Sequence, residues 1–166
     1  MTFAPLARPL AYTTLIFLGA IFGFFYAWIC STIWGLDRLE PNTAIAAMQA
    51  MNASVRNAVF APTFFGTTPL AFLAAWAAHR ARAALSARWL MLAGLTYGFG
   101  AMMLTMMVNV PMNEVLAIVE LPNAEADQIW QDYARTWEFW NIIRTLASGA
   151  ALLMCGMALY RWPGRA

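Results

Sequence analysis

The stretch WEFWNIIRTLASGAALLMCGMAL, residues 137–159, decides the fold class because it is long and apolar enough to cross a bilayer. A spanning helix needs about 20 mostly apolar residues, and three further stretches meet that need. The four predicted spans are roughly residues 11–34, 59–78, 89–110 and 137–160. The sequence therefore predicts an all-α integral membrane four-helix bundle that forms one membrane domain over residues 1–166.

Composition indicates the same class and excludes a nucleic-acid partner. Of the 166 residues, 62% are hydrophobic and 11% are charged, whereas a soluble domain is about half apolar and about a quarter charged. All ten basic residues are arginines, and the formal net charge is only +2. Nucleic-acid binding needs a clustered basic patch. The lipid bilayer is therefore the expected partner, and no nucleic acid is.

The two longer connections are predicted to be helical as well. Residues 41–58 begin with Pro41, which the first turn of a helix tolerates, and carry Gln49, Asn52 and Arg56 along one stripe. This pattern predicts an extra amphipathic helix between the first and second spans. The segment PNAEADQIWQDYARTWEFW, residues 122–140, is acidic and aromatic, and we expect it to extend the fourth helix out of the membrane by several turns.

The charge distribution predicts the orientation in the membrane. Six arginines lie near the chain ends or in the short second connection, with no acid among them: Arg8, Arg80, Arg82, Arg88, Arg161 and Arg165. All eight acids lie in the other two connections or at the helix ends beside them. Because cytoplasmic loops collect arginine and lysine, we expect both termini in the cytoplasm. The acidic connections then face the periplasm of a bacterial inner membrane.

A polar stripe lies near the outer end of the fourth span. Trp137, Asn141, Arg144 and Ser148 follow one another at four, three and four residues, so they share one helical face. A charge at membrane depth costs at least a few kcal/mol unless it reaches the interface or is paired. Arg144 is therefore the residue whose presence most needs an explanation.

Two other segments bring amides to the same leaflet. Asn109 and Asn113 lie four residues apart in the third span, with Pro111 between them. Proline removes a backbone hydrogen bond, so we expect a distorted helix end there. The amphipathic segment brings Asn52 and Arg56 to the same side. Buried amides must be paired, so these side chains are expected to face one another.

Two interpretations of Arg144 remain open at this point. In the structural one, Arg144 reaches the interface, or it pairs with Glu138 or Glu114 and locks the bundle. In the functional one, arginine, asparagine, tryptophan and tyrosine side chains line an outward-facing pocket.

The remaining features predict structural roles. Cys30 and Cys155 lie toward opposite faces of the membrane, so no disulfide is expected between them. His79 is the only histidine and adjoins the arginine cluster, where a solvated loop residue is the simpler interpretation. No set of metal ligands is visible in the sequence. Gly94 and Gly98 have the spacing that lets membrane helices approach closely, which predicts packing within the bundle.

Five segments, in this order, resemble the DUF1772 family of small four-helix membrane proteins, also called anthrone oxygenase-like: FYAW (25–28), AIAAMQAMNASVRNAVF (44–60), FFGT (64–67), NVPMNE (109–114) and WEFWNIIRT (137–145). Some fungal relatives are associated with oxidising polyketide anthrones to anthraquinones. The resemblance implies the fold and a membrane oxidoreductase of that type. The positions that match its recurrent polar pattern are Gln49, Asn52, Asn109, Asn113, Trp137, Asn141 and Arg144.

The chemistry of an anthrone explains how such a site would work without a cofactor. The methylene opposite the carbonyl is acidic, and the enolate can give an electron to O₂ without a metal or a flavin. The predicted partners are thus O₂ and a hydrophobic, planar aromatic molecule, and no metal or other cofactor is expected. The predicted base is Tyr133, Glu114 or water. The predicted catalytic donors are Arg144, Asn141, Asn109, Asn113 and Asn52, and the predicted substrate-binding residues are Trp137, Trp130, Tyr133, Trp140 and Gln49.

Two alternatives stay open beside the oxygenase. The chain would be non-enzymatic if the pocket binds a lipid or a small hydrophobic ligand, or if the chain is a subunit of a membrane complex. It would be a haem or quinone redox protein if a methionine or tyrosine served as an axial ligand. The natural substrate and the formation of a homo-oligomer are also left open.

Overall fold

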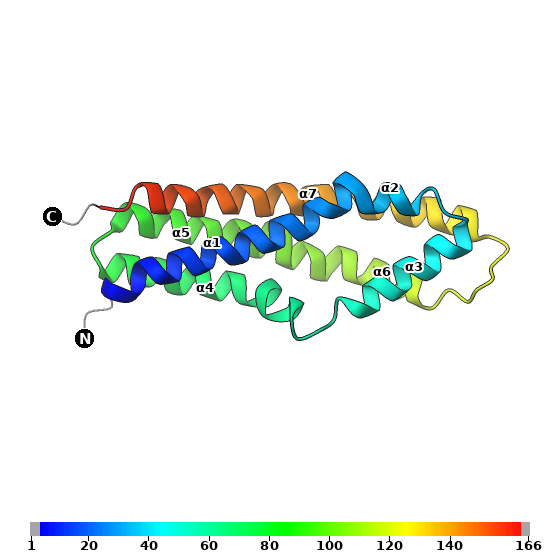
Figure 1. Ribbon diagram of the computed structural model, residues 1–166, viewed down its shortest axis with the longest axis horizontal. Helices are drawn as coiled ribbons and strands as arrows, with labels where there is room; N and C mark the ends of the chain where they lie inside the picture. The colour runs from blue at the N-terminus through cyan, green and yellow to red at the C-terminus, as the bar shows by residue number, and fades with distance from the viewer. Residues whose placement is uncertain (1–3, 164–166) are drawn as a thin grey trace.

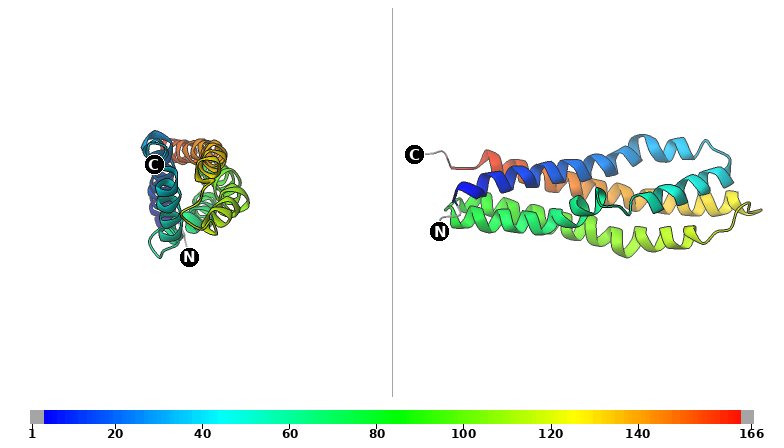
Figure 2. Two further views of the ribbon diagram at one scale, coloured as in Figure 1. Left: turned by 90° about the vertical axis from the view of Figure 1, so that its right-hand side faces the viewer. Right: turned by 60° about the horizontal axis from the view of Figure 1, so that its bottom comes forward.

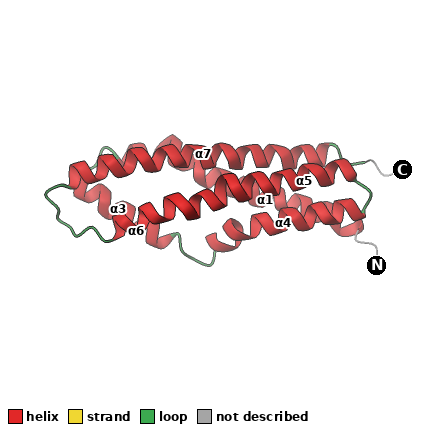
Figure 3. Ribbon diagram, turned by 180° about the vertical axis from the view of Figure 1, so that it is seen from behind, coloured by secondary structure: helices red, strands yellow, loops and turns green. Residues whose placement is uncertain are grey.

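The computed structural model describes residues 4–163, and every secondary-structure element in that range is a helix (Figure 1, Figure 3). The prediction of an all-α membrane bundle is confirmed. The elements are α1 (Ala4–Ala27), η1 (Trp28–Thr32), α2 (Ile33–Leu36), α3 (Pro41–Ser54), α4 (Phe60–Arg80), α5 (Ala84–Tyr97), η2 (Gly98–Met103), η3 (Thr105–Asn109), α6 (Val110–Ala117) and α7 (Ala126–Tyr160), where η marks a π-helical turn.

Three continuous helices are long and apolar enough to cross a membrane, which identifies an integral membrane protein. They are Pro5–Leu36, Ala84–Ala117 and Ala126–Tyr160. These correspond to the first, third and fourth predicted spans. The second predicted span corresponds to α4, whose threonines and two prolines, Pro62 and Pro69, lower its mean hydropathy. The predicted count of four helices is not confirmed, because α3 and α4 are separate helices beside the three long ones.

The core lies where α1, α4, α5 and α7 pack along one another. Seen end-on, the helices run along one common axis (Figure 2). Leu18, Phe25, Leu90 and Tyr97 are fully buried or nearly so, among many buried alanines that let the helices approach closely. The Tyr97 hydroxyl donates a 2.8 Å hydrogen bond to the Phe64 carbonyl, so the polar end of this buried ring is satisfied.

The helices α3 and α4 lie end to end along the bundle, with a turn between them halfway along its length (Figures 1 and 2). The predicted amphipathic segment 41–58 corresponds to α3, which ends at Ser54. In the turn that follows, Asn57 Oδ1 accepts hydrogen bonds from the Val59 and Phe60 N–H groups at the start of α4. At the other end of α3, hydrogen bonds from Asn42 and Thr43 hold the pKa of the Glu40 carboxyl below its usual value.

The third span is distorted near Pro111, as predicted, but it does not end there. The helix continues to Ala117, and the π-helical turns η2 and η3 absorb the change of register. At the end of η3, the Val110 N–H donates to the Thr105 carbonyl, one residue further back than in an α-helix. Pro111 is the second residue of α6, and its missing N–H leaves one hydrogen bond of the continuous helix unmade.

Both ends of the described chain lie at one end of the bundle, together with the α4–α5 turn (Figure 1). Arg8 donates a 3.0 Å hydrogen bond to the Pro163 carbonyl, which holds the two ends together. Five of the six arginines that predict the orientation are therefore at this end, and Arg165 lies outside the described residues. Cys30 and Cys155 are free, Cys30 exposed and Cys155 buried.

The glycines of the third span allow close helix contacts inside the bundle. A Cβ atom on Gly94 would lie 2.7 Å from the Phe72 ring of α4, and one on Gly98 would lie 3.3 Å from Thr68. The predicted role of this pair in bundle packing agrees with these contacts.

Gly100 gives a stability test of the same packing. A Cβ atom there would lie 2.7 Å from the Ala147 Cβ of α7, which cannot rotate away. Gly100→Ala should therefore lower the free energy of unfolding by about 1–3 kcal/mol. Gly156→Ala is the matched control, because no atom lies within 4 Å of its added Cβ. Thermal unfolding in detergent measures both, and equal melting temperatures for the two variants would contradict the predicted clash.

Candidate functional site

A cavity of about 1150 Å³ lies on the side of the bundle where α3 ends and α4 begins. Its walls come from α1, η1, the end of α3, the 55–59 turn and the first turns of α4, and from η3, α6 and α7. The lining is mostly apolar and aromatic, with Phe24, Phe25, Trp28, Phe60 and Trp137 among the rings. The cavity forms here because the chain leaves α3 and enters α4 through a turn, so that no continuous helix covers this side.

Arg144 is the buried charge of this cavity. Only 4% of its surface is exposed, and its guanidinium carbon lies 4.5 Å from the Phe25 ring centroid and 4.8 Å from that of Trp137. Its Nε donates to Asn141 Oδ1 at 2.7 Å, and one terminal nitrogen donates to Thr105 Oγ1 at 3.3 Å. These bonds use two of its five N–H groups. The cation thus rests between two aromatic faces, with donors left for a ligand in the cavity.

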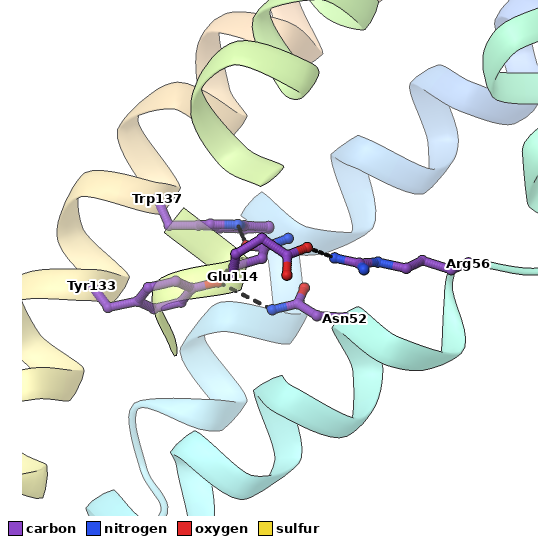
Figure 4. A network of polar contacts seen from close by, with 6 residues as sticks. Asn52, Arg56, Glu114, Tyr133 and Trp137 are labelled. Carbon is purple, nitrogen blue, oxygen red and sulfur yellow. Dashed lines mark hydrogen bonds and ion pairs between the residues drawn. The ribbon is translucent and has the colours of Figure 1, made fainter. Parts of the chain in front are cut away.

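No carboxylate within residues 4–163 lies at ion-pair distance from Arg144. The expected pairing with Glu114 is wrong, because Glu114 pairs with Arg56 instead (Figure 4). The expectation that Arg144 reaches the interface also disagrees with its burial. An arginine without a counter-ion is costly at membrane depth, so aromatic contacts and polar groups must offset that cost here.

A second polar network includes Asn52, Tyr133 and Trp137 (Figure 4), and Asn113 is its central acceptor. Asn113 Oδ1 accepts hydrogen bonds from the Tyr133 hydroxyl at 2.8 Å and from Trp137 Nε1 at 3.0 Å. Asn52 Nδ2 donates to the Tyr133 oxygen at 3.3 Å. Asn52, Asn113 and Trp137 also line the cavity. Three segments far apart in the sequence thus fix one another, as the sequence predicts.

The Arg56–Glu114 ion pair marks the exposed side of the cavity. The two side chains are 57% and 53% exposed, and both line the cavity. Arg56 extends from the turn after α3, and Glu114 comes from α6 (Figure 4). Glu114 is the only acid among the described residues that line this cavity.

Two predicted donors lie behind the cavity wall. Asn141 is fully buried, donates to the Phe25 carbonyl at 3.3 Å and accepts from Arg144, so it orients the guanidinium. Asn109 is also fully buried, and its amide nitrogen donates to the Trp137 carbonyl at 3.4 Å. Its Oδ1 has no hydrogen-bond partner in the described part of the chain. Such a buried acceptor needs a donor, for example a water molecule or a ligand hydroxyl.

Four predicted substrate-binding residues make other contacts and are not among the lining residues. One of them is Tyr133, which contacts Asn113 and Asn52 as described above. Trp130 donates from Nε1 to Asp37 Oδ1 at 3.0 Å, which ties α7 to the end of α2. Gln49 donates to the Leu116 and Val119 carbonyls, so it satisfies the end of α6. Trp140 is half-buried and packs against Phe139. Their part in substrate binding remains an untested prediction.

The predicted site omitted three residues that contact its centre. Thr105 accepts from Arg144, Phe25 stacks on the guanidinium, and Trp28 packs on Trp137 with ring centroids 4.9 Å apart. Phe25 and Trp28 belong to the FYAW segment, so the resemblance contained a signal for both. Thr105 has no comparable signal, because a single threonine among methionines reads as a membrane-facing residue.

Pro111→Ala tests whether the distortion of the third span positions the network. Alanine restores an N–H, which allows the π-helical turn to relax into an α-helix and rotates Asn113 relative to Trp137. The variant should stay folded but bind a hydrophobic fluorescent probe in the cavity about tenfold more weakly. Tryptophan fluorescence should shift as the 3.0 Å bond to Trp137 is lost. Wild-type binding in a folded variant would mean that the network does not depend on Pro111.

The fold and the site together define a class of protein: a small, all-helical integral membrane protein with an aromatic-walled cavity around a buried arginine. The model of the anthrone oxygenase family matches residues 50–154, more than half of the chain, and the chain belongs to that family. The matched region includes every predicted polar site residue except Gln49. A search of curated proteins and a search of solved structures each found no match.

Proposed function

We propose that the protein is a membrane oxidoreductase that oxidises a planar aromatic, anthrone-like substrate with O₂ in the cavity around Arg144. The observation that carries the proposal is the buried Arg144 guanidinium, which has free donors, no carboxylate partner among the described residues, and aromatic rings on two sides. A pocket for a small molecule typically has a volume of about 300–1000 Å³. A cavity of about 1150 Å³ has room for three fused rings.

The first step breaks a C–H bond and forms an oxyanion. A base removes a proton from the methylene, and the electron pair moves onto the carbonyl oxygen. Arg144 would bind that oxygen through its remaining N–H groups, as preorganised donors do in many active sites. Its positive charge, held without a counter-ion, favours the enolate over the neutral anthrone.

We assign the base to Glu114. The methylene and the carbonyl lie on opposite sides of the central ring, so the base and the oxyanion donor must stand on opposite sides of the substrate. Thr105, which contacts Arg144, precedes Glu114 by nine residues in the same helix, about 13 Å at 1.5 Å per residue. That separation leaves room for one ring system between them. The Tyr133 hydroxyl is less suited, because it already donates to Asn113.

The later steps use O₂ as the oxidant. The enolate transfers one electron to O₂, and the two radicals combine into a carbon–oxygen bond. A proton from the Glu114 carboxyl gives the hydroperoxide. When the second proton leaves the same carbon, its electron pair forms the new C=O bond and the O–O bond breaks. The hydroxide that leaves takes up that proton, so one anthrone and one O₂ yield one anthraquinone and one water. These steps need no metal or flavin, and the cofactor-free mechanism is part of the proposal.

The experiment that tests this function is oxidation in detergent. Purified protein, a panel of anthrones and air are incubated, and anthraquinone formation and O₂ consumption are followed against a detergent blank that subtracts autoxidation. We expect one O₂ consumed for each anthraquinone formed. Tight binding of anthrones without turnover would support the alternative of a non-enzymatic protein for hydrophobic ligands.

The orientation in the membrane has its own prediction. Arg144 lies sixteen residues before Tyr160, the last residue of α7, or about 24 Å along the helix at 1.5 Å per residue. With the arginine-rich end in the cytoplasm, the cavity therefore belongs to the periplasmic leaflet of a core about 30 Å thick. Reporter fusions after Arg82 and at the C-terminus should report cytoplasm, and a fusion at Asn123 should report periplasm. A cytoplasmic signal at Asn123 would reverse the assignment.

A further inference from the structure

A second cavity, of about 670 Å³, lies at the arginine-rich end of the bundle and is separate from the Arg144 cavity. Its lining residues belong to the last turns of α4 and the first turns of α5. These two helices are joined by the turn at this end of the bundle (Figure 1). Its lining residues are Ala75, Trp76, His79, Ala84, Ala87, Arg88, Met91 and Leu92. None of them has a role in the proposed oxidation.

The charge around this cavity is of one sign. Arg88 and His79 line it, Arg80 is the last residue of α4 beside it, and Arg82 lies in the turn that follows. Residues 60–113 contain no aspartate or glutamate, so α4 and α5 offer no internal counter-ion to Arg88. A basic pocket between membrane helices at the cytoplasmic side is suited to an anionic lipid headgroup.

The other half of the cavity is apolar and faces outward from the bundle. Trp76, Met91 and Leu92 are 43%, 44% and 45% exposed, although each is large and hydrophobic. They lie about one helical turn from the polar residues of the cavity, Trp76 before His79 in α4, and Met91 and Leu92 after Arg88 in α5. A polar site that continues into an apolar groove matches a phosphate joined to acyl chains better than it matches a free anion.

We propose that this cavity binds one anionic phospholipid, with its phosphate at Arg88 and His79 and an acyl chain along Trp76, Met91 and Leu92. The bound lipid supplies the counter-charge that the sequence lacks between Phe60 and Asn113 and fills the groove between α4 and α5. The site is independent of the proposed oxidation, because the two cavities share no residue.

Lipid titration of the full-length protein in detergent tests the proposal. Phosphatidylglycerol and phosphatidylcholine are titrated separately, and native mass spectrometry counts the bound lipid. We expect one phosphatidylglycerol to bind at least fivefold more tightly than phosphatidylcholine. Because one arginine near a membrane surface contributes about 1 kcal/mol to anionic-lipid binding, Arg88→Gln should weaken phosphatidylglycerol binding about fivefold. Because Arg88 is exposed, the variant should fold as the wild type does, and its melting temperature measures this.

Arg161→Gln is the matched control. It removes the same charge at the same end of the bundle, but Arg161 packs on Tyr160 and lies outside the cavity. Its affinity should stay within twofold of wild type, and an equal loss in both variants would overturn the site in favour of diffuse attraction. Inorganic phosphate supplies the anion without acyl chains and should leave the lipid bound. Displacement of phosphatidylglycerol by phosphate at an equal concentration, or equal affinity for both lipids, would also overturn the proposal.

Discussion

Arg144→Lys should fold and yet lose at least a hundredfold in the rate of anthrone oxidation. Lysine keeps the charge but lacks the planar fork of donors that Arg144 presents between Phe25 and Trp137. Removal of one oxyanion donor from an active site costs about 10²–10³ in rate. Stopped-flow measurement of anthraquinone formation, with the melting temperature measured in the same detergent, gives both quantities.

Arg144→Met separates a catalytic arginine from a structural one. Methionine removes the buried charge, whose desolvation costs several kcal/mol, and leaves Asn141 Oδ1 and Thr105 without one donor each, at about 1–3 kcal/mol for a buried group. These effects oppose each other, so the melting temperature should stay near or above that of wild type while turnover collapses. A large loss of stability with activity retained per folded molecule would refute the functional interpretation of Arg144.

The sequence predicted the presence of the helices better than the residues at which they end. A long apolar run is visible within one segment, whereas the end of a helix also depends on contacts with other segments. The apolar residues 137–159 were enough to predict the fourth span. The acidic segment before Trp137 belongs to the same helix, α7. The π-helical turns before Pro111 were not predicted. A proline indicates that a hydrogen bond is lost, but the way in which the helix absorbs that loss depends on packing against α7.

The sequence showed that Arg144 needs compensation but did not identify all the groups that provide it, for a physical reason. A helical stripe shows that Arg144 needs compensation, but the compensating groups come from other segments. Phe25 belongs to the first helix and Thr105 to the third, and neither carries a charge that would pair with an arginine. The same limit applies to Glu114, which either Arg56 or Arg144 could pair with by charge alone.

Glu114→Gln should reduce turnover by about 10²–10⁴, the usual contribution of general base catalysis. Glutamine keeps the size and a hydrogen bond to Arg56 but cannot take up the methylene proton. Stability should change little, because the ion pair is more than half exposed and such pairs contribute about 0–1 kcal/mol. Anthrone that carries deuterium at the methylene provides a second readout, since slower proton removal should increase the isotope effect on turnover.

Two control variants distinguish a base from a structural ion pair. Arg56→Gln breaks the same ion pair but keeps the Glu114 carboxylate at the cavity, so it should retain most of the activity. Glu120→Gln removes an exposed acid on the same connection that does not line the cavity, and it should behave as wild type. If Arg56→Gln lost as much activity as Glu114→Gln, the ion pair rather than the carboxylate would be the functional unit. Because C–H cleavage needs a proton acceptor and the other described lining residues include no acid, an active Glu114→Gln with an unchanged isotope effect would leave water as the base.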